Sequence, residues 1–358
     1  MTNKSIILTG GGTAGHVSLN EAIIPSFFEA GYDVHYIGSE TGIEREIIGN
    51  AFPDVPYYPI SSGKLRRYFS LQNFTDPFKV VKGVFQALSI IRKIKPTVIF
   101  SKGGFVSVPV VMAAKLANVP VVVHESDVTP GLANKLAQPF ASHVYTVFNE
   151  TLSHLPQDKA TCVGSVIREQ LYEGNRERGR ELCQFYNTKK VLLIMGGSLG
   201  SVVINEAVRS NLPKLLEDFN VIHLCGKGNI DESFIHMNGY CQFDYVTTEL
   251  PDLLYASDYI VSRAGSNSIF EFLALHKPML LIPLSAAKSR GDQILNANLF
   301  KKQKLAHVLQ EEDLTRKSFL KAVEKLVANE EQLIDAMTEV KSPITPSEMV
   351  KLITQYEK

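Results

Sequence analysis

The first segment of the chain that could do chemistry combines glycines with a histidine. Residues 10–15 read Gly-Gly-Gly-Thr-Ala-Gly, and His16 follows them directly. Their spacing includes the G-x-G-x-x-G of dinucleotide-binding turns, but Glu40 is a poor match for the acidic ribose ligand because two residues separate it from the second predicted strand. The dipole of a following helix favours a neutral histidine in its first turn. The segment therefore indicates a general base, His16, beside an anionic substrate, and a turn without a ligand is the alternative.

A second glycine-rich segment follows another predicted strand. Residues 196–201 read Gly-Gly-Ser-Leu-Gly-Ser and come directly after the apolar run at residues 191–195. Glycines allow the backbone to approach a ligand closely, and the helix that follows offers unpaired N–H groups to an anion. A diphosphate suits such a site. Because two such turns occur at matching places in the two halves of the chain, a role in ligand binding is favoured over a purely structural role.

Three polar clusters lie where further predicted strands end, at residues 101–105, 124–127 and 263–268. In a parallel sheet the carboxyl ends of the strands share one edge, so these clusters are candidates for ligand contact. Glu271 lies one turn into the helix that follows the third cluster, and a solvated helix position is its alternative. Helix capping is the alternative for the residues of N-cap type, which are Ser126, Asp127 and Ser266.

The usual motifs for metal-assisted and ATP chemistry are missing from the sequence. It contains no Asp-x-Asp pair that would hold Mg²⁺ or Mn²⁺ against a nucleotide diphosphate, and no G-x-x-x-x-G-K-[ST] phosphate loop. We therefore expect no metal ion and no other cofactor, and an ATPase is disfavoured. Helix N-termini and cationic side chains would have to stabilise a leaving diphosphate.

The elements that must position these residues follow a regular order. Apolar runs without polar alternation, as in strands covered on both faces, alternate with amphipathic segments. The predicted strands are residues 6–8, 34–37, 98–100, 121–123, 144–147, 191–195, 221–224, 241–243, 259–261 and 279–282. The predicted helices are residues 16–30, 74–95, 106–118, 130–140, 202–217, 251–256, 266–275, 293–302 and 347–356. The pattern pauses at the charged residues 164–190 and then resumes, which predicts an α/β protein with two doubly wound domains.

The composition narrows the class of protein further. The 358 residues carry 37 Lys and Arg against 37 Asp and Glu, so a globally basic nucleic-acid binder is disfavoured. The four cysteines form no C-x-x-C pair, which leaves a zinc ribbon or a disulfide framework unsupported. The longest apolar stretch, residues 106–123, is interrupted by Lys115, Asn118 and Pro120, so no segment is predicted to span a bilayer. We expect a cytoplasmic protein whose membrane contact, if any, is peripheral.

One segment has the composition of a membrane-contacting surface. Residues 61–95 contain eight basic side chains and a single acidic one, Asp76, and basic residues with exposed aromatics suit an anionic lipid surface. The basic residues are Lys64, Arg66, Arg67, Lys79, Lys82, Arg92, Lys93 and Lys95. The interleaved apolar residues are Tyr68, Phe69, Phe74, Phe78, Val81 and Phe85. We expect part of residues 74–85 to be exposed; an amphipathic helix with a solvated lysine face is the alternative.

Taken together and in this order, the motifs resemble the MurG family, the UDP-N-acetylglucosamine:undecaprenyl-diphospho-muramoyl-pentapeptide glucosaminyltransferases of bacterial cell-wall synthesis. The resemblance covers nearly the whole chain and rests on residues 11–16, 101–107, 124–125, 196–200 and 263–265, with Gln293 and Asn296. It implies the GT-B architecture, in which two Rossmann-like domains face a cleft. The implied domains are residues 1–165, which face the acceptor and the membrane and are joined by a returning helix at about 345–358, and residues 166–344, which bind UDP-GlcNAc.

The resemblance also implies roles for individual residues. The implied contacts with UDP-GlcNAc are Thr13, Ala14, Gly15, Arg168, Ser198, Val246, Ser266, Asn267, Ser268, Glu271 and Gln293. Within that set, Glu271 would accept hydrogen bonds from the ribose and Gln293 would bind the GlcNAc hydroxyls. The implied acceptor or neighbouring contacts are Gly103, Gly104, Asp127 and Asn296. Two residues depart from the family pattern, since Ala14 replaces a usual glycine and Asp127 a usual asparagine.

The predicted activity is metal-independent, inverting transfer of GlcNAc from UDP-GlcNAc to the 4-hydroxyl of the muramoyl sugar of lipid I, which gives lipid II. His16 is the first choice for the base and Glu125 the second. The expected partners are UDP-GlcNAc, undecaprenyl-linked lipid I and the anionic cytoplasmic face of the cell membrane, without nucleic acid. Three alternatives remain open: a UDP-sugar 2-epimerase of the same fold, an NAD(P)-dependent oxidoreductase, and a UDP-sugar binder without catalysis.

Overall fold

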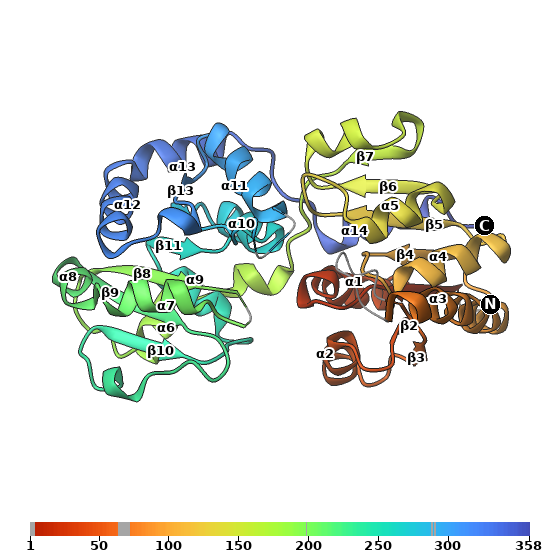
Figure 1. Cartoon of the computed structure of the whole chain (residues 1–358), viewed down its shortest axis with the longest axis horizontal. Coiled ribbons are helices and arrows are strands. Elements are labelled where there is room, and N and C mark those ends of the chain that lie inside the picture. The colour runs from red at the N-terminus through yellow and green to blue at the C-terminus, as the bar shows by residue number, and fades with distance from the viewer. Residues whose placement is uncertain (1–3, 64–71, 198, 288, 290) are drawn as a thin grey trace. The chain divides into compact units, whose positions relative to one another are not determined.

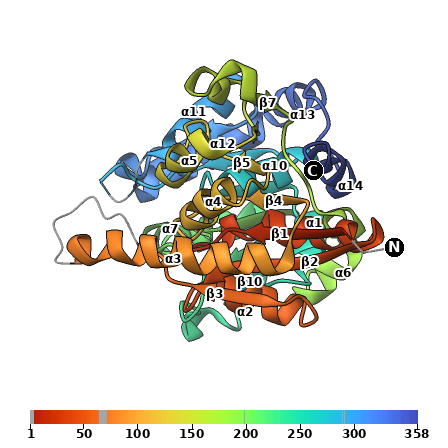
Figure 2. The ribbon, with the colours of Figure 1, turned by 90° about the vertical axis from the view of Figure 1, so that its right-hand side faces the viewer.

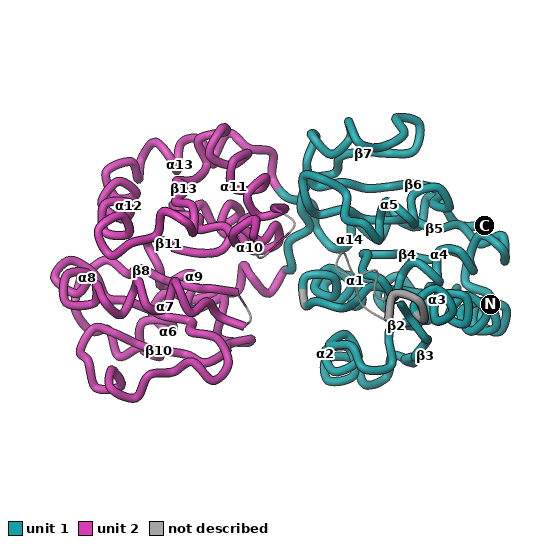
Figure 3. Tube along the Cα trace, viewed as in Figure 1, with its two compact units in different colours: residues 1–168, 343–358 teal, residues 169–342 magenta. Residues whose placement is uncertain are grey.

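The computed structural model describes residues 4–63, 72–197, 199–287, 289 and 291–358, and the chain divides into two compact units. Unit 1 comprises residues 1–168 and 343–358, and unit 2 comprises residues 169–342 (Figure 3). Each unit contains one parallel sheet with helices packed against it (Figure 1). The predicted α/β fold with two doubly wound domains is therefore confirmed.

Unit 1 contains a sheet with the strand order β3-β2-β1-β4-β5-β6-β7, and each of these pairings is parallel. The strands are β1 (Lys4–Thr9), β2 (Tyr32–Ser39), β3 (Tyr57–Ile60), β4 (Val98–Ser101), β5 (Val121–Glu125), β6 (His143–Thr146) and β7 (Ala160–Cys162). The helices are α1 (Ser18–Glu29), α2 (Ile43–Ala51), α3 (Gln72–Ile94), α4 (Ser107–Leu116), α5 (Leu132–Ala137) and α14 (Pro346–Thr354), with short 3-10 helices η1 (Ala14–His16), η2 (Gln138–Phe140), η3 (Asn149–His154) and η4 (Gln157–Lys159). The strand order reverses between β1 and β4, and ligands of open parallel sheets bind beyond the carboxyl ends at such a point.

Successive residues of β1 pack on opposite faces of this sheet. Ile6 and Leu8 belong to a core cluster with residues of α1 and α14, whereas Ile7 belongs to a second cluster with residues of α3 and α4. Strand side chains alternate between the two faces, and here both faces are covered by helices. This is why the strand reads as an unbroken apolar run in the sequence.

The carboxyl-terminal helix α14 belongs to unit 1 although residues 169–342 precede it in the chain (Figure 3). Met349, Val350 and Ile353 are buried in the same core cluster as the residues of α1. The helix starts at a capping box, in which the Thr345 hydroxyl accepts from the Glu348 N–H and the Glu348 carboxylate accepts from the Thr345 N–H. Burial of its apolar face therefore secures the chain's return to the first sheet.

Helix α3 is the longest helix of unit 1 and lies beside α4 (Figure 2). Its Val84, Ala87 and Ile91 are buried in the core, while Phe78 is 76% exposed and Phe85 is 66% exposed. The prediction that part of residues 74–85 is exposed is thus confirmed for these two side chains. Other residues of the predicted membrane-contacting surface lie outside the described residues or side chains. They are Lys64, Arg66, Arg67, Tyr68, Phe69 and Phe74.

Unit 2 contains a sheet with the strand order β10-β9-β8-β11-β12-β13, again with parallel pairings. The strands are β8 (Lys190–Met195), β9 (Phe219–Leu224), β10 (Tyr240–Phe243), β11 (Tyr259–Ser262), β12 (Met279–Leu281) and β13 (His307–Val308). The helices are α6 (Arg176–Leu182), α7 (Val202–Arg209), α8 (Leu212–Asp218), α9 (Leu250–Ala256), α10 (Ser266–Ala274), α11 (Asp292–Lys302), α12 (Arg316–Ala328) and α13 (Glu330–Thr338), with 3-10 helices η5 (Glu169–Glu173), η6 (Glu232–Phe234) and η7 (Glu311–Asp313). The strand order of this sheet also reverses, between β8 and β11.

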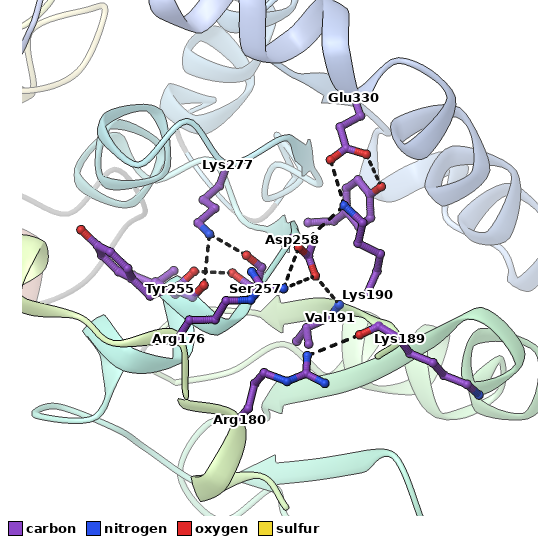
Figure 4. Close-up of polar contacts among 12 residues, drawn as sticks. Arg176, Arg180, Lys189, Lys190, Val191, Tyr255, Ser257, Asp258, Lys277 and Glu330 are labelled. Carbon is purple, nitrogen blue, oxygen red and sulfur yellow. Dashed lines mark hydrogen bonds and ion pairs between the residues drawn. The ribbon is translucent and has the colours of Figure 1, made fainter. Parts of the chain in front are cut away.

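A charged network ties together the amino ends of the central strands of unit 2 (Figure 4). The Asp258 carboxylate accepts from the Val191 N–H at 2.8 Å and from the Arg176 guanidinium at 3.1 Å. Lys190 at the start of β8 pairs with Glu330 of α13 at 3.3 Å. The network lies at the amino ends of the strands, whereas the glycine-rich turn follows the carboxyl end of β8. It therefore stabilises the sheet at the end that is remote from the turn.

The structure differs from the sequence-based prediction at several elements. The single helix predicted over residues 202–217 is two helices, α7 and α8, because the Asn211 side chain donates to the Ala207 carbonyl at 2.8 Å and Pro213 opens a new helix. The strands β3, β7 and β13 and the helices α2 and α6 were not predicted. Those three strands form sheet edges and are only partly buried, so they lack the long apolar run that marks a central strand.

Of the helices in the described part of the chain, none combines the length and the apolar character that crossing a bilayer requires.

Candidate functional site

The first glycine-rich turn leads from β1 into η1 and brings His16 back over the backbone of the turn. Its Nδ1 lies 3.1 Å from the Gly11 carbonyl oxygen and 3.1 Å from the Thr13 hydroxyl. Gly12 has a φ of +87°, a conformation that glycine adopts without strain. Because a carbonyl oxygen can only accept, Nδ1 carries the proton in this contact. In the neutral imidazole the lone pair then lies on Nε2, as a general base requires.

The loop after β4 packs directly against this turn. The Gly11 N–H donates to the Gly103 carbonyl at 3.3 Å, and a side chain at Gly104 would collide with the Gly11 carbonyl. Gly103 and Gly104 have φ values of +103° and +85°. These two glycines therefore allow the close approach of the two loops and lie beside the first turn.

The Glu125 carboxylate, at the end of β5, is buried and fully engaged. It accepts from the Asp127 N–H at 3.0 Å, from the Gly131 N–H at 2.9 Å and from the Asn134 side chain at 2.8 Å. Burial raises the pKa of Glu125, and the neighbouring Asp127 adds to this rise. Since both oxygens hold the loop that contains Asp127, the geometry favours a positioning role for Glu125 and leaves His16 as the better candidate base.

Lys102 is a buried cation beneath the same turn. From the sequence it was predicted only as part of the cluster at residues 101–105. Its ammonium lies 3.0 Å from His124 Nδ1 and also donates to the Ser126 hydroxyl. Burial lowers the pKa of Lys102 to about 8, although Glu125 and Asp127 oppose the shift. Burial and the nearby Lys102 lower the pKa of His124 as well. The only sequence signal for the buried Lys102 ammonium was its position directly after a strand. Its burial could not be predicted, because it depends on how the folded chain packs.

The second glycine-rich turn, in unit 2, leads from β8 to α7. Gly197 and Gly200 have φ values of +93° and +73°, and the Gly200 N–H donates to the Gly197 carbonyl at 2.9 Å. A side chain at Gly200 would collide with the Cys225 carbonyl. Ser198, a predicted diphosphate contact, lies outside the described residues. The turn delivers the chain to Ser201, the N-cap residue of α7.

Arg263 links this second turn to the ends of two further strands. Its buried guanidinium donates to the Ser201 hydroxyl at 2.7 Å and to the Ile282 carbonyl at 3.1 Å, and to the Pro283 carbonyl at 3.2 Å. It also forms an ion pair with the Glu311 carboxylate. Arg263 thereby fixes the carboxyl ends of β8, β11 and β12 relative to one another, a role that strand-end position alone did not reveal.

Most of the predicted donor residues of unit 2 lie on the helices that follow β11 and β12. Ser266, Asn267, Ser268 and Glu271 lie in the first two turns of α10, and Val246 follows β10. Gln293 of α11 accepts from the Leu284 N–H at 3.0 Å through its carbonyl oxygen. Asn296 is fully buried and donates to the Ala264 carbonyl at 3.2 Å, which gives it a positioning role. Helix α10 lacks a side-chain cap and starts from Gly265.

The remaining predicted residues lie in unit 1. Thr13 and Gly15 are exposed in the first turn, and Ala14 begins η1. Arg168 ends the first segment of unit 1. Its charge lowers the pKa of Glu21 against the larger effect of burial, which raises that pKa. The capping alternative for Ser126 and Asp127 is wrong, because α5 starts from Gly131.

Metal ligands do not gather at either turn. Among the residues that the structure describes, no group of three or more His, Cys, Asp or Glu side chains is placed to hold a metal ion.

Comparisons with known families and sequences give consistent matches along the chain. The glycosyltransferase family 28 N-terminal domain matches residues 6–146, and the family 28 C-terminal domain matches residues 191–351. The chain is 59% identical over 329 residues, 92% of each chain, to the UDP-N-acetylglucosamine--N-acetylmuramyl-(pentapeptide) pyrophosphoryl-undecaprenol N-acetylglucosamine transferase of Geobacillus thermodenitrificans (strain NG80-2). It is 54% identical over 355 residues, 99% of this chain and 100% of the other, to the protein of the same name from Clostridium botulinum (strain Langeland).

Solved structures resemble the fold of the whole chain. The crystal structure of Acinetobacter baumannii MurG matches with a TM-score of 0.76 at 22% identity, covering 98% of this chain and 99% of that chain. The glycosyltransferase of kitacinnamycin matches with a TM-score of 0.75 at 15% identity, covering 100% of both chains. At such identities the likeness concerns the fold alone, and it confirms the expected GT-B architecture.

Proposed function

The chain belongs to glycosyltransferase family 28 and, within it, to the MurG family, and from this membership we propose that it transfers GlcNAc from UDP-GlcNAc to lipid I, the undecaprenyl-linked muramoyl pentapeptide, to give lipid II. The observation that carries the proposal is an identity of 54–59% to curated members over at least 92% of the chain. The histidine at the first turn and the helix start after the second turn each support the same reaction.

In the proposed mechanism, His16 Nε2 takes the proton from the 4-hydroxyl of the muramoyl sugar. The hydroxyl oxygen attacks the anomeric carbon of GlcNAc from the face opposite to UDP, the bond to the diphosphate oxygen breaks, and UDP leaves with the electron pair. The anomeric configuration inverts to give a β linkage. Base catalysis of this kind contributes about 10²–10⁴-fold to the rate.

The proposed donor site lies mainly in unit 2. The amino-terminal N–H groups of α7, after the glycine-rich turn with Ser198, receive the negative charge of the diphosphate. Glu271 on α10 accepts from the ribose hydroxyls, and the NH₂ group of Gln293 donates to the GlcNAc hydroxyls. The other donor contacts we propose are Thr13, Ala14, Gly15, Arg168, Val246, Ser266, Asn267 and Ser268.

Release of UDP from UDP-GlcNAc, measured with and without a lipid I analogue, tests this function. We expect UDP release only when the acceptor is present, together with a disaccharide lipid product. UDP-GlcNAc consumption without an acceptor would favour the 2-epimerase alternative. Tight UDP-GlcNAc binding without any turnover would favour a binding module, and a change in NADH fluorescence without UDP binding would favour the oxidoreductase.

Membrane contact is the second part of the proposal, because the undecaprenyl tail of the acceptor keeps it in a bilayer. Phe78, Val81 and Phe85 lie on one face of α3 at helical spacing, and all three are exposed. Lys79 and Lys82 are exposed beside them, and each basic residue near an anionic leaflet contributes about 1 kcal/mol. We therefore place the protein at the cytoplasmic face of the membrane, with α3 in peripheral contact with anionic lipid.

Sedimentation with vesicles of phosphatidylglycerol or of phosphatidylcholine tests the membrane contact. We expect binding to the anionic vesicles only, weakened by salt because screening reduces the attraction. The double variant Lys79→Glu/Lys82→Glu should lose most of this binding while UDP affinity stays unchanged, and Phe78→Ser/Phe85→Ser should weaken it in a way that salt does not relieve. Lys317→Glu/Lys321→Glu on α12 makes the same charge change in unit 2, and an equal loss for that control would contradict the assignment to α3.

A further inference from the structure

Glu44 is a buried carboxylate that the proposed mechanism does not yet use. It lies in the first turn of α2 and is fully shielded from solvent. Its Oε1 accepts from the Ser39 N–H at 2.9 Å and from the Ser39 hydroxyl at 2.5 Å. Its Oε2 accepts from the Gly12 N–H at 3.0 Å. Burying a carboxylate is costly unless hydrogen bonds compensate it, and these three contacts all come from neutral donors.

The contact with Gly12 connects Glu44 to His16. The Gly12 N–H and the Gly11 carbonyl belong to the same peptide group, and that carbonyl oxygen lies 3.1 Å from His16 Nδ1. A carboxylate that accepts from one end of a peptide group polarises it and makes the carbonyl at the other end a stronger acceptor. The result is a continuous chain from carboxylate to peptide to imidazole.

The glycines around Glu44 leave room for this arrangement. A side chain at Gly11 or at Gly42 would collide with the Glu44 carboxylate. Gly12 adopts its positive φ of +87° at the point where its N–H meets the carboxylate. The turn thus closes around the Glu44 carboxylate.

We propose that Glu44 is a positioning residue that acts on His16 through the Gly11–Gly12 peptide, holding the proton on Nδ1 and increasing the basicity of Nε2. In Ser-His-Asp sites a carboxylate acts on Nδ1–H directly, whereas here one peptide group lies between them. The Thr13 hydroxyl, 3.1 Å from the same nitrogen, can donate or accept, so the carbonyl decides which nitrogen is protonated. This inference rests on the proposed role of His16 as the base.

A double-mutant cycle separates this role from a purely structural one. Glu44→Gln keeps the size of the side chain and removes its charge, and we expect kcat to fall about 10–100-fold, the usual cost of removing a partner that orients a functional imidazole. The KM for UDP-GlcNAc should stay unchanged. In the His16→Ala background the same substitution should have no further effect on kcat, because its effect passes through His16. Glu46→Gln on the exposed side of the same helix is the matched control.

An equal loss of kcat from Glu44→Gln in both backgrounds would overturn the proposal, because a structural role does not depend on His16. If Glu44→Gln does not fold, Glu44→Asp draws the carboxylate back from Gly12 by one methylene while keeping the charge. We then expect a smaller loss of kcat that also disappears in the His16→Ala background, and wild-type activity for Glu44→Asp would contradict the proposal.

The tautomer of His16 gives a readout that does not depend on turnover. Nitrogen NMR of the histidine-labelled enzyme, with His16 assigned by comparison with His16→Ala, should show the proton on Nδ1 in the wild type and a mixture of both tautomers in Glu44→Gln. An unchanged tautomer would overturn the inference even if His16 is the base. If His16→Ala is active, the proposed base is wrong, and the tautomer measurement still tests the link between Glu44 and His16.

Discussion

The two glycine-rich turns occupy equivalent places, because each follows the strand that comes first along the chain in its parallel sheet. The buried side chains that pack against the two turns nevertheless carry opposite charges. Behind the first turn lies the Glu44 carboxylate, which accepts from the Gly12 N–H at 3.0 Å. Behind the second lies the Arg263 guanidinium, which donates to the Ser201 hydroxyl at 2.7 Å and is paired with Glu311. The first turn is followed by a short 3-10 helix that carries His16, and the second by the regular helix α7.

This difference teaches that a glycine-rich turn does not by itself specify a phosphate site. A buried carboxylate repels a phosphate at the first turn and instead makes a nearby imidazole a stronger proton acceptor. At the second turn the charges of Arg263 and Glu311 compensate each other. The dipole of α7 then favours an anion there. The same backbone device thus suits base chemistry in unit 1 and diphosphate binding in unit 2.

The largest expected effect is on catalysis at the first turn. His16→Ala should lower kcat by about 10²–10⁴-fold, because a general base is lost. UDP affinity, measured by isothermal titration calorimetry, should stay unchanged since the diphosphate is assigned to unit 2. His236→Ala, which removes an exposed histidine of unit 2, is the control. A loss of UDP affinity as large as the loss of kcat would contradict the separation of the two roles.

A smaller effect is expected on stability at the second turn. Gly200→Ala should destabilise the protein by about 2–5 kcal/mol, because alanine is strained at a φ of +73° and its methyl group would collide with the Cys225 carbonyl. Gly12→Ala should cost only about 1–2 kcal/mol, since the space beside that glycine is open. Chemical denaturation followed by circular dichroism measures both, because the chain contains no tryptophan.

Gly49→Ala in helix α2 is the matched control for these two substitutions. Its surroundings are open and it lies inside a helix, so alanine there should stabilise the protein by about 0.5–1 kcal/mol. If Gly12→Ala and Gly200→Ala lower the free energy of unfolding equally, the close approach of Gly200 to Cys225 does not contribute to the destabilisation.

Donor binding should respond at α10 with a still smaller change. Glu271→Ala should weaken UDP binding by about 1–3 kcal/mol, the range for losing a hydrogen bond to a charged group. Glu206→Ala, an exposed glutamate on α7, should leave the affinity unchanged. An unaltered dissociation constant for UDP in Glu271→Ala would contradict the proposed hydrogen bond between Glu271 and the ribose.

The remaining prediction is a pH dependence of stability at Lys102, the cation buried beneath the first turn. Its pKa is about 8 in the folded chain against 10.5 for the free side chain, so between these values the unfolded chain binds more protons and stability rises with pH. The wild type should gain up to about 1.4 kcal/mol per pH unit relative to Lys102→Met over this window, and the difference between them should be constant below pH 8. Lys115→Met on the exposed face of α4 is the control, and parallel curves for wild type and Lys102→Met would contradict the assignment.

Much of the fold could be predicted because its signals are local. The central strands are apolar on both faces, so β1, β4 and β8 appear in the sequence as unbroken runs. The edge strands β3, β7 and β13 could not be predicted in this way, since they are short and only partly buried. The site residues that follow strands were found because strand ends mark ligand sites, but their individual partners were not.

What the sequence determined by itself is the order of strands, turns and helices, the two glycine-rich turns and the family to which the chain belongs. Only the tertiary structure decided which charges lie behind those turns. Glu44 is one of two glutamates in a short helix, and nothing in its spacing indicates that it reaches Gly12. Its burial, like that of Lys102 and Arg263, results from the packing of helices and loops that are distant in the chain. Hydrogen bonds across such distances depend on the folded backbone, and therefore they have no local pattern in the sequence.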